Sequence, residues 1–256
     1  MYHNLFSCKN KVALVTGGLG LIGKEIVRGL NDLGAFVCIA DINEHQMNDF
    51  KNLKAVKFMK FDITSEDSIC QTLEIVIKQY KKIDILVNCA YPRTGDWATK
   101  CEEVRIDSWK MNVNSHLGGY FLCCQKVAEQ MKSQGGGSII NFASTYGIVA
   151  PDFSIYEGTT MTSPVAYSAI KGGIITLSKY LATYYAKNNI RVNCISPGGV
   201  FDNQPASFVE KYIARTPLGR MATPNDMVGA VLYLATDASL YVTGHNLSVD
   251  GGWTAW

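Results

Sequence analysis

The sequence has no uninterrupted apolar run of the ~18 residues that a membrane-spanning helix needs, and it carries almost no net charge. The first absence excludes a spanning helix. The net charge of +2 argues against nucleic acid or an anionic membrane as the main partner. The start of the chain also lacks the basic segment, apolar run and small-residue cleavage site of a secretory signal. We therefore expect a cytoplasmic protein that binds neither nucleic acid nor a membrane.

Cysteine is present without a pattern. The eight cysteines include no Cys-x-x-Cys pair, and only Cys123 and Cys124 are adjacent. This spacing indicates reduced, mostly buried thiols, and we expect neither a disulfide framework nor a metal site. The sequence also lacks repeats, low-complexity tracts and linkers. With 47% hydrophobic residues the chain can bury a large core, and we expect a single domain that spans residues 1–256.

What the chain does contain is an alternation of short apolar runs, typical of buried strands, with longer helical stretches. This order predicts an α/β fold of the Rossmann type, a doubly wound parallel sheet with helices on both faces. The helical stretch at about 107–132 has more apolar and small residues than one sheet-facing stripe requires, which indicates packing against another subunit. The expected strands cover 11–16, 35–40, 55–61, 83–87, 138–143, 190–195 and 246–249.

A glycine-rich turn, Gly17-Gly-Leu-Gly-Leu-Ile-Gly23, stands between the first strand and the first helix. A turn in this setting binds the pyrophosphate of a dinucleotide. Gly17 permits the tight turn, Gly20 lets the backbone approach the phosphates, and Gly23 allows close packing of helix on strand. The amides of the first helical turn, around Leu21 and Ile22, then face the anion.

The second strand ends at Asp41, at the position where a carboxylate binds the ribose hydroxyls of NAD. A carboxylate would repel the 2′-phosphate of NADP, and no Arg or Lys follows in Ile42-Asn43-Glu44. The sequence therefore favours NAD as cofactor, although a strand-end aspartate can also serve only as a turn residue. Asp62 follows the third strand, and Asn88 ends the fourth. Both therefore lie at the edge of the sheet where cofactors bind.

Ser144, Tyr167 and Lys171 form the stretch around which the chain is organised. Tyr167-Ser-Ala-Ile-Lys171 places a phenol and an ammonium on one helix face, about one turn apart. The lysine charge, together with the positive ring of an oxidised nicotinamide, would favour the phenolate and make Tyr167 a base. Ser144, after the strand at 138–143, can hold the substrate oxygen whose proton is transferred.

These motifs occur in the same order in short-chain dehydrogenases/reductases, and the resemblance covers essentially the whole chain. More narrowly, the segments that begin at His116, Pro151 and Pro197 resemble oxidoreductases of bacterial flagellin-modification and surface-sugar pathways. The resemblance implies a seven-stranded sheet, a homotetramer or dimer built on the long helices, and hydride transfer between nicotinamide and a secondary alcohol or ketone. It implies that Tyr167 is the acid/base, that Ser144 orients the substrate oxygen and that Lys171 binds the nicotinamide ribose. The residues that it places along the cofactor are Ile42, Asp62, Ile63, Asn88, Ala90, Pro197, Gly198 and Val200.

The chain departs from this family at several positions. The spacing of the glycine turn is typical of the extended branch, whereas the chain length and the Asp-Gly-Gly-Trp ending favour the single-domain branch. His116 occupies the slot of a catalytic asparagine, and it either takes over that role or is a structural helix histidine. Asn112 and Asn114 lie one turn or less upstream. Asp202 stands where a threonine usually meets the carboxamide of the nicotinamide.

The segment between Ser144 and Tyr167 is longer than in most members of the family, which predicts an insertion at about 151–164 beside the active site. Its Asp152, Tyr156 and Glu157 are candidates for contacts with sugar hydroxyls. Arg93, just past the fourth strand, is a candidate for a phosphate or carboxylate. Each of these residues has an equally weighted alternative as part of the ordinary surface.

The sequence as a whole predicts an NAD-dependent oxidoreductase that acts on a polar, sugar-derived alcohol or ketone. One alternative is a sugar or sugar-nucleotide epimerase or dehydratase that regenerates its NAD in each turnover. Another is a non-catalytic, cofactor-sensing protein, against which the presence of Ser144, Tyr167 and Lys171 argues.

Overall fold

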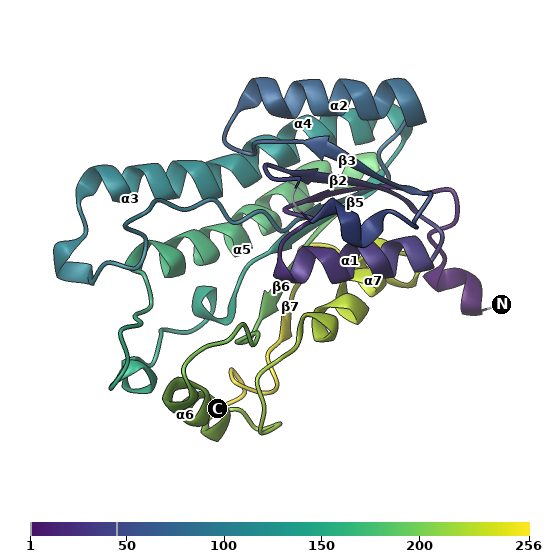
Figure 1. Ribbon diagram of the computed structural model, residues 1–256. Coiled ribbons are helices and arrows are strands. Elements are labelled where there is room, and N and C mark those ends of the chain that lie inside the picture. The colour runs from purple at the N-terminus through teal and green to yellow at the C-terminus, as the bar shows by residue number, and fades with distance from the viewer. Residues whose placement is uncertain (1, 45) are drawn as a thin grey trace.

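The computed structural model describes residues 2–44 and 46–256, and at its centre lies a sheet of seven parallel strands (Figure 1). The strand order is β3-β2-β1-β4-β5-β6-β7, so the chain builds outward from β1 to one edge, returns, and builds outward to the other. The sheet is therefore doubly wound, which confirms the predicted fold class. The strands are β1 (Val12–Thr16), β2 (Phe36–Asp41), β3 (Val56–Lys60), β4 (Ile85–Asn88), β5 (Gly137–Phe142), β6 (Ile190–Pro197) and β7 (Asn246–Val249).

Helices cover both faces of the sheet, and the side chains of each strand alternate between the two resulting cores (Figure 1). In β1, Val12 and Leu14 face the core under α2, α4 and α5, whereas Ala13 and Val15 face the core under α1 and α7. All four are essentially inaccessible to solvent, and each large apolar side chain contributes about 1.5–3 kcal/mol by its burial. The helices are α1 (Leu21–Asp32), α2 (Glu66–Tyr80), α3 (Ile106–Val113), α4 (Gly119–Gln134), α5 (Val165–Tyr185), α6 (Ala206–Ala214) and α7 (Val228–Ala235).

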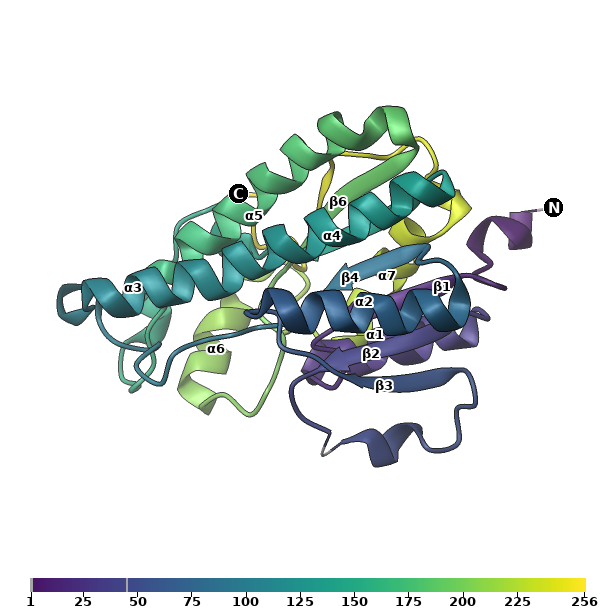
Figure 2. The ribbon, with the colours of Figure 1, turned by 90° about the horizontal axis from the view of Figure 1, so that it is seen from above.

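The helix expected at about 107–132 is interrupted. A single π-helical turn, Asn114–Gly118, separates α3 from α4, although the two continue one another in space (Figure 2). The wider turn carries His116, whose side chain is fully buried. Directly after it, a Cβ atom on Gly119 would lie 2.8 Å from the carbonyl oxygen of Ile63, so the helix passes very close to the loop after β3. Apolar periodicity cannot reveal such a turn, which is often found at functional sites.

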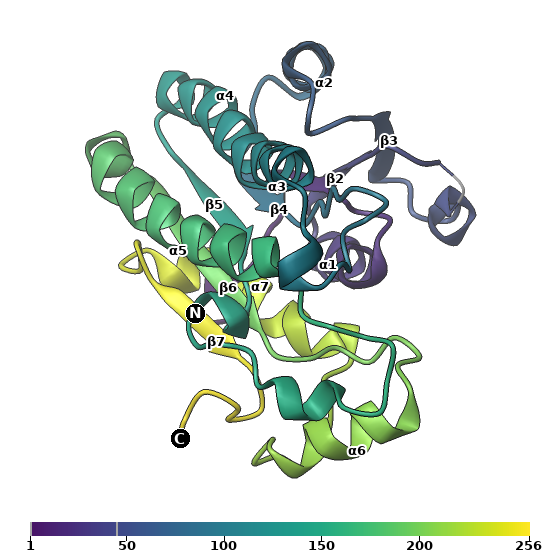
Figure 3. The same cartoon turned by 90° about the vertical axis from the view of Figure 1, so that its left-hand side faces the viewer.

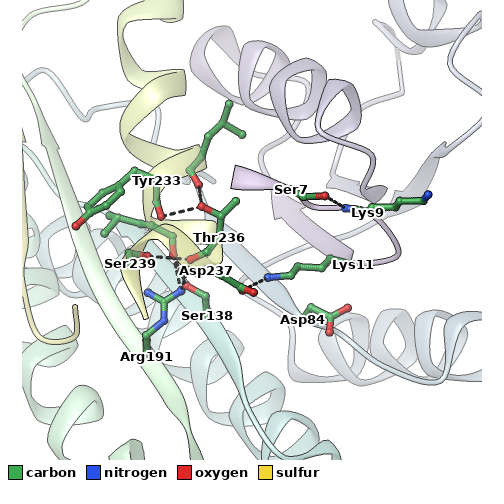
Figure 4. Close-up of polar contacts among 12 residues, drawn as sticks. Ser7, Lys9, Lys11, Asp84, Ser138, Arg191, Tyr233, Thr236, Asp237 and Ser239 are labelled. Carbon is green, nitrogen blue, oxygen red and sulfur yellow. Dashed lines mark hydrogen bonds and ion pairs between the residues drawn. The ribbon is translucent and has the colours of Figure 1, made fainter. Parts of the chain in front are cut away.

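A polar network lies at the amino-terminal ends of β1, β5 and β6 (Figure 4). Arg191 of β6 donates from Nη2 to the carbonyl oxygens of Leu234 (2.8 Å) and Thr236 (3.3 Å), at the carboxyl end of α7. Ser138 of β5 donates to the same Leu234 oxygen at 2.8 Å, and Lys11 pairs with Asp237 at 2.7 Å. These contacts satisfy the last carbonyl groups of α7.

Beyond the carboxyl ends of the strands, α6 and the insertion at 151–164 pack against each other (Figure 3). They share a small apolar cluster that includes Ile155, Phe208 and Trp253 and is separate from the two cores of the sheet. α6 lies in the segment that follows β6, and its Phe208 and Tyr212 are buried in this cluster. None of the helices in the described part of the chain is long and apolar enough to cross a membrane.

Candidate active site

The glycine turn after β1 has the backbone geometry that its glycines allow. Gly17 has a φ of +64°, in the left-handed region, and its amide donates to the carbonyl oxygen of Ala40 at 2.8 Å. A Cβ atom on Gly17 would lie 2.7 Å from the backbone of Ala90, and one on Gly23 would lie 2.1 Å from the carbonyl oxygen of Gly17. No side chain larger than glycine fits at either position without a backbone shift.

The amino end of α1 is open to an anion. Gly20 is its N-cap, and no side chain accepts a hydrogen bond there. The amides of the first turn, which includes Leu21 and Ile22, therefore have no side-chain partner at the end of the helix where the dipole favours negative charge. Gly20 is exposed, and the only neighbour that a Cβ atom on it would meet is the carbonyl oxygen of Gly17, at 3.2 Å. These features fit the pyrophosphate of a dinucleotide.

Asp41, the last residue of β2, lies beside this turn. Its Oδ2 accepts from the amide of Leu19 at 3.0 Å, inside the glycine turn, and its Oδ1 accepts from the amide of Asn43 at 3.2 Å. Ile42 is exposed. The carboxylate is thus fixed in orientation next to the turn, at the place where a ribose hydroxyl would be bound.

The residues predicted after β3 and at the end of β4 are half-buried or fully buried. Asp62 accepts from the amide and hydroxyl of Thr64, whereas Ile63 is buried in the core beneath α4. Asn88 is fully buried, and it donates to Oδ1 of Asn141 at 2.9 Å and accepts from the hydroxyl of Thr16 at 3.2 Å. The Asn88 side chain therefore ties neighbouring strands together beneath the site.

Ala90 and the residues after β6 lie at the same edge of the sheet. The amide of Ala90 donates to the hydroxyl of Thr16 at 3.3 Å. Gly198, directly after Pro197, donates its amide to Val249 at 3.0 Å, and a Cβ atom on it would meet the backbone of Asp250. Further along this segment, Val200 forms a β-bridge with Ala222. The amide of the exposed Asp202 donates to the side-chain oxygen of Gln204.

Ser144, Tyr167 and Lys171 are brought together at the carboxyl end of β5. Tyr167 and Lys171 share one face of α5, as the spacing predicted. Lys171 is almost completely buried, its Nζ donates to the carbonyl oxygen of Phe142 at 2.8 Å, and it lies 5.6 Å from the centre of the Tyr167 ring. Ser144 is buried beside them, and its hydroxyl oxygen accepts from the amide of Tyr146 at 3.2 Å.

His116 reaches Lys171 from the π-helical turn. Its Nε2 lies 3.4 Å from Nζ of Lys171, and its Nδ1 is buried with no hydrogen-bond partner in the described protein. Burial, and then the charge of Lys171, hold the pKa of His116 well below its usual range, so the ring is neutral near pH 7. A neutral Nε2 can accept a hydrogen bond from the ammonium group. Asn112, one turn upstream, instead bonds Thr94 and Ser108 and holds the loop after β4.

Burial acts against charge on both catalytic candidates of α5. It lowers the pKa of Lys171 to about 7, and it raises the pKa of Tyr167 above its ordinary value, although a hydrogen bond from Ser144 acts in the opposite direction. The polypeptide by itself therefore keeps the phenol protonated. The phenolate requires additional positive charge, of the kind that an oxidised nicotinamide ring carries.

An aromatic wall of three rings, Tyr91, Trp97 and Tyr146, surrounds Tyr167. Their ring centres lie 6.0, 6.3 and 6.5 Å from that of Tyr167, each in an edge-on arrangement. None of the three was predicted from the sequence. The only available signal was that two of them stand close together in the irregular segment after β4.

The insertion contributes one residue to this arrangement. Tyr156 donates its hydroxyl to that of Tyr146 at 3.2 Å and packs on Phe208 of α6. Glu157 has a side chain that is 76% exposed, and Asp152 is paired with Arg215. The structure thus brings Tyr156 to the site, turns Glu157 to the surface and occupies the carboxylate of Asp152. The guanidinium of Arg93 lies 5.3 Å above the ring of Tyr91.

Two comparisons decide the family of the chain. A family model described as Enoyl-(Acyl carrier protein) reductase matches residues 20–254. A short chain dehydrogenase from Leptospira borgpetersenii, solved with bound NAD+, is similar with a TM-score of 0.89 and 39% identity, over 99% of this chain and 96% of that one.

The chain belongs to the short-chain dehydrogenase/reductase family.

Other short-chain dehydrogenases/reductases differ in cofactor and substrate. A curated relative, the post-translational flagellin modification protein A of Campylobacter coli, is 37% identical over 254 residues, which cover 96% of this chain and 98% of the relative. A gluconate 5-dehydrogenase from Burkholderia cenocepacia, in complex with NADP and tartrate, has a TM-score of 0.88 and 28% identity over the full length of both chains. Membership of the short-chain dehydrogenase/reductase family therefore establishes a nicotinamide-dependent oxidoreductase fold but leaves NAD and NADP both open.

Two further findings concern residues that could hold a metal or form disulfides. Within residues 2–44 and 46–256, no group of three or more His, Cys, Asp or Glu side chains could hold a metal ion. All eight cysteines are free, and five of them are buried.

Proposed function

We propose that this protein is an NAD-dependent dehydrogenase that transfers hydride between nicotinamide and a secondary alcohol or ketone of a sugar derivative. The observation that carries the proposal is the convergence of Ser144, Tyr167 and Lys171 at one edge of the sheet, next to an uncapped helix terminus. The bacterial relative described as a flagellin modification protein supports a role in flagellin-glycan or surface-glycan biosynthesis. The neighbour with bound NAD+ supports the choice of cofactor.

The residues of the site have distinct tasks in this reaction. A nicotinamide held at this edge of the sheet would supply the acceptor for the hydride from the carbon that carries the hydroxyl group. Ser144 holds the substrate oxygen in place, and Tyr167 takes its proton as the carbonyl forms. Lys171 binds the nicotinamide ribose and places its positive charge near the phenolate. The glycine turn, with Gly17, Gly20 and Gly23, binds the pyrophosphate together with the first-turn amides of α1.

The remaining cofactor contacts lie along the carboxyl edge of the sheet. We place Asp41 and Ile42 against the adenosine ribose and Asp62 and Ile63 near the adenine. The other contacts of this group follow the strand ends and are made by Asn88, Ala90, Pro197, Gly198 and Val200.

Asp41 selects NAD over NADP, and its replacement by alanine is expected to relax this preference. The fixed carboxylate next to Leu19 repels a 2′-phosphate, and alanine removes this repulsion together with the hydrogen bonds to the ribose. We expect kcat/KM with NAD to fall about 10-fold or more, and the NAD/NADP ratio to approach one, because a hydrogen bond to a charged group contributes about 1.5–3 kcal/mol. Steady-state kinetics with both cofactors measures this. An unchanged ratio would assign the selection to another residue.

His116 supports Lys171 in this scheme. Replacing His116 by leucine removes the acceptor at 3.4 Å, so the ammonium form of Lys171 loses a stabilising contact and its pKa falls below about 7. We expect the limb of the kcat–pH profile that reports loss of the Lys171 proton to move to lower pH. We also expect kcat at neutral pH to fall about 10-fold or more.

The control for His116 is its replacement by asparagine, whose side-chain oxygen can accept a hydrogen bond from the same ammonium group. This variant should retain most of the activity and the position of the limb. Equal pH profiles for wild type and the leucine variant would make His116 a structural residue only.

Net formation of NADH separates the dehydrogenase from its closest rival. An epimerase or dehydratase regenerates NAD, so one bound NAD supports many turnovers. A dehydrogenase makes one molecule of product for each NAD consumed. Product analysis with a panel of hexose phosphates and nucleotide sugars, at limiting and at excess NAD, tests this. Product in large excess over limiting NAD, with no NADH, would replace the proposal by the epimerase or dehydratase.

We also propose that the protein forms a homo-oligomer, a tetramer or a dimer, through α4 and α5. These helices lie side by side (Figures 2 and 3), and with α3 they line a shallow apolar groove. The groove includes Trp109, Leu117 and Phe121, and Phe121 is 44% exposed. Large exposed apolar patches of this kind are typical of interfaces.

The free cysteines fit a reducing compartment, which supports the cytoplasm as the location.

Replacing Phe121 by glutamate is expected to dissociate the oligomer, because it would bury a charge at the centre of the interface. Light scattering after size-exclusion chromatography should show a species of half the mass or less. The matched control is Ile75 on α2, which is 52% exposed outside this groove, and its replacement by glutamate should leave the mass unchanged. An unchanged mass for the Phe121 variant would show that the subunit interface does not include this groove.

A further inference from the structure

The surroundings of Tyr167 are aromatic and rigidly held. Tyr91 and Trp97 come from the loop after β4, and their rings contact each other edge-on at 5.8 Å. This loop is fixed by Asn112 of α3, whose Oδ1 accepts from the amide of Thr94 at 3.0 Å and whose Nδ2 donates to the Thr94 hydroxyl at 2.8 Å. Asn112 is buried, so its hydrogen bonds to Thr94 are shielded from water.

The third ring of the aromatic wall is fixed from the opposite direction. Tyr146 follows Ser144 by two residues, and Tyr156 of the insertion holds its hydroxyl. The insertion is anchored to α6 by Lys211, whose Nζ donates to the carbonyl oxygens of Ser154 (3.1 Å) and Glu157 (2.8 Å). Rings held in this way offer flat apolar faces and edges to a molecule that reaches Tyr167. Such surfaces match the apolar face of a saturated ring better than a flexible open chain.

The charge next to the aromatic wall is positive. The guanidinium of Arg93 lies 5.3 Å from the ring centre of Tyr91, which itself lies 6.0 Å from that of Tyr167, so the cation is within about 11 Å of the reacting phenol. In the described part of the chain, no carboxylate lies within 4.0 Å of Arg93, whereas Arg28, Arg215 and Arg220 are each paired with one.

The three carboxylates nearest to this region in the sequence have polar neighbours other than Arg93. Asp96 accepts from the hydroxyl of Ser108 at 2.7 Å, and Asp152 accepts from the amide of Ser154 and pairs with Arg215. Glu157 is exposed beside Lys211. The guanidinium of Arg93, exposed beside Tyr91 and without a carboxylate partner among the described residues, is suited to a planar or tetrahedral anion.

We propose that the substrate is a ring-shaped secondary alcohol or ketone that carries an anionic group, a carboxylate or a phosphate, on the side of the ring away from the reacting carbon. Tyr91, Trp97 and Tyr146 hold the ring against Tyr167, and Arg93 binds the anion. This inference rests on the proposed dehydrogenase function and names the substrate class of the same site.

Binding to the Tyr167→Phe variant saturated with NAD tests the substrate class without turnover. Calorimetry compares two matched pairs of ring compounds: 4-hydroxycyclohexanecarboxylate with its carboxamide, and glucose 6-phosphate with glucose. The anionic member of at least one pair should bind about 10- to 100-fold more tightly, because hydrogen bonds to charged groups have this strength. The pair that shows the preference identifies the anion as carboxylate or phosphate.

Two further variants, each made in the Tyr167→Phe protein, assign the effect to residues. Arg93→Gln should abolish the preference for the anion, whereas Arg105→Gln, which removes an exposed charge at the start of α3, should preserve it. Trp97→Leu should weaken the binding of the ring compounds about 10-fold but leave the affinity for the open-chain anion gluconate unchanged.

The outcomes separate this inference from the proposed function. Equal binding of charged and neutral members in both pairs, binding of none of them, a preference that survives Arg93→Gln, or tighter binding of gluconate than of the ring anions would each overturn the substrate class. NADH formation by the wild type from neutral alcohols would then still support the dehydrogenase. An Arg93-dependent preference without NADH from any compound would instead remove the dehydrogenase and keep the substrate class.

Discussion

Replacing Tyr167 by phenylalanine should lower kcat by about 10²- to 10⁴-fold, because the site loses the group that we propose as its acid/base. The affinity for NAD should change little, since the glycine turn and Asp41 are untouched. Phenylalanine fills the same space among Tyr91, Trp97 and Tyr146, so the aromatic packing around residue 167 persists. Kinetics of NADH formation and calorimetric titration with NAD provide the two readouts.

The matched control for this variant is Tyr180→Phe. Tyr180 lies on the same helix, α5, and is 63% exposed, so loss of its hydroxyl should leave kcat unchanged. If Tyr167→Phe retained more than about a tenth of the wild-type kcat, another group would have to be the base. The site as described offers His116 as the next candidate, because its ring is neutral near pH 7.

Replacing Gly23 by alanine should abolish NAD binding and destabilise the protein. The new Cβ atom would lie 2.1 Å from the carbonyl oxygen of Gly17, so the turn and α1 have to separate. Overpacking of this kind costs about 1–3 kcal/mol, which corresponds to a fall in Tm of roughly 2 to 12 °C for a chain of this size. The first-turn amides of α1 would also leave the position that the pyrophosphate requires, and we expect the Kd for NAD to rise about 100-fold or more.

Gly229 provides the control for Gly23. It lies in α7, and a Cβ atom on it would have no neighbour within 4 Å. Alanine there should leave NAD binding intact and stabilise the helix by about 0.5–1 kcal/mol, because glycine is a poor helix former. Thermal unfolding and NAD titration of both variants test the pair. Wild-type Tm and NAD affinity in Gly23→Ala would contradict the close packing of α1 on β1.

The parts of the fold that the sequence predicted are those encoded locally. The β1 strand is a short apolar run followed by glycines, and β7 was predicted with its observed bounds. Spacing within one helix was also sufficient to place Tyr167 and Lys171 on one face.

The parts that the sequence did not reveal depend on contacts between distant segments. The positions of the three rings of the aromatic wall depend on the hydrogen bonds between Asn112 and Thr94 and on the packing of the insertion on α6. Neither contact follows from local spacing in the sequence. The π-helical turn that buries His116 is invisible to apolar periodicity. The pairing of Asp152 with Arg215 likewise depends on how the insertion meets α6, and it occupies one of the carboxylates considered for contacts with sugar hydroxyls.

The most direct test of the central claim is NADH formation by the purified wild-type protein with NAD, across the hexose phosphates, nucleotide sugars and ring-shaped acids named above. The account predicts NADH in an amount equal to the ketone formed, with at least one anionic ring compound as substrate. It is contradicted if the protein binds NAD but no alcohol in the panel reduces it, or if product forms without net NADH.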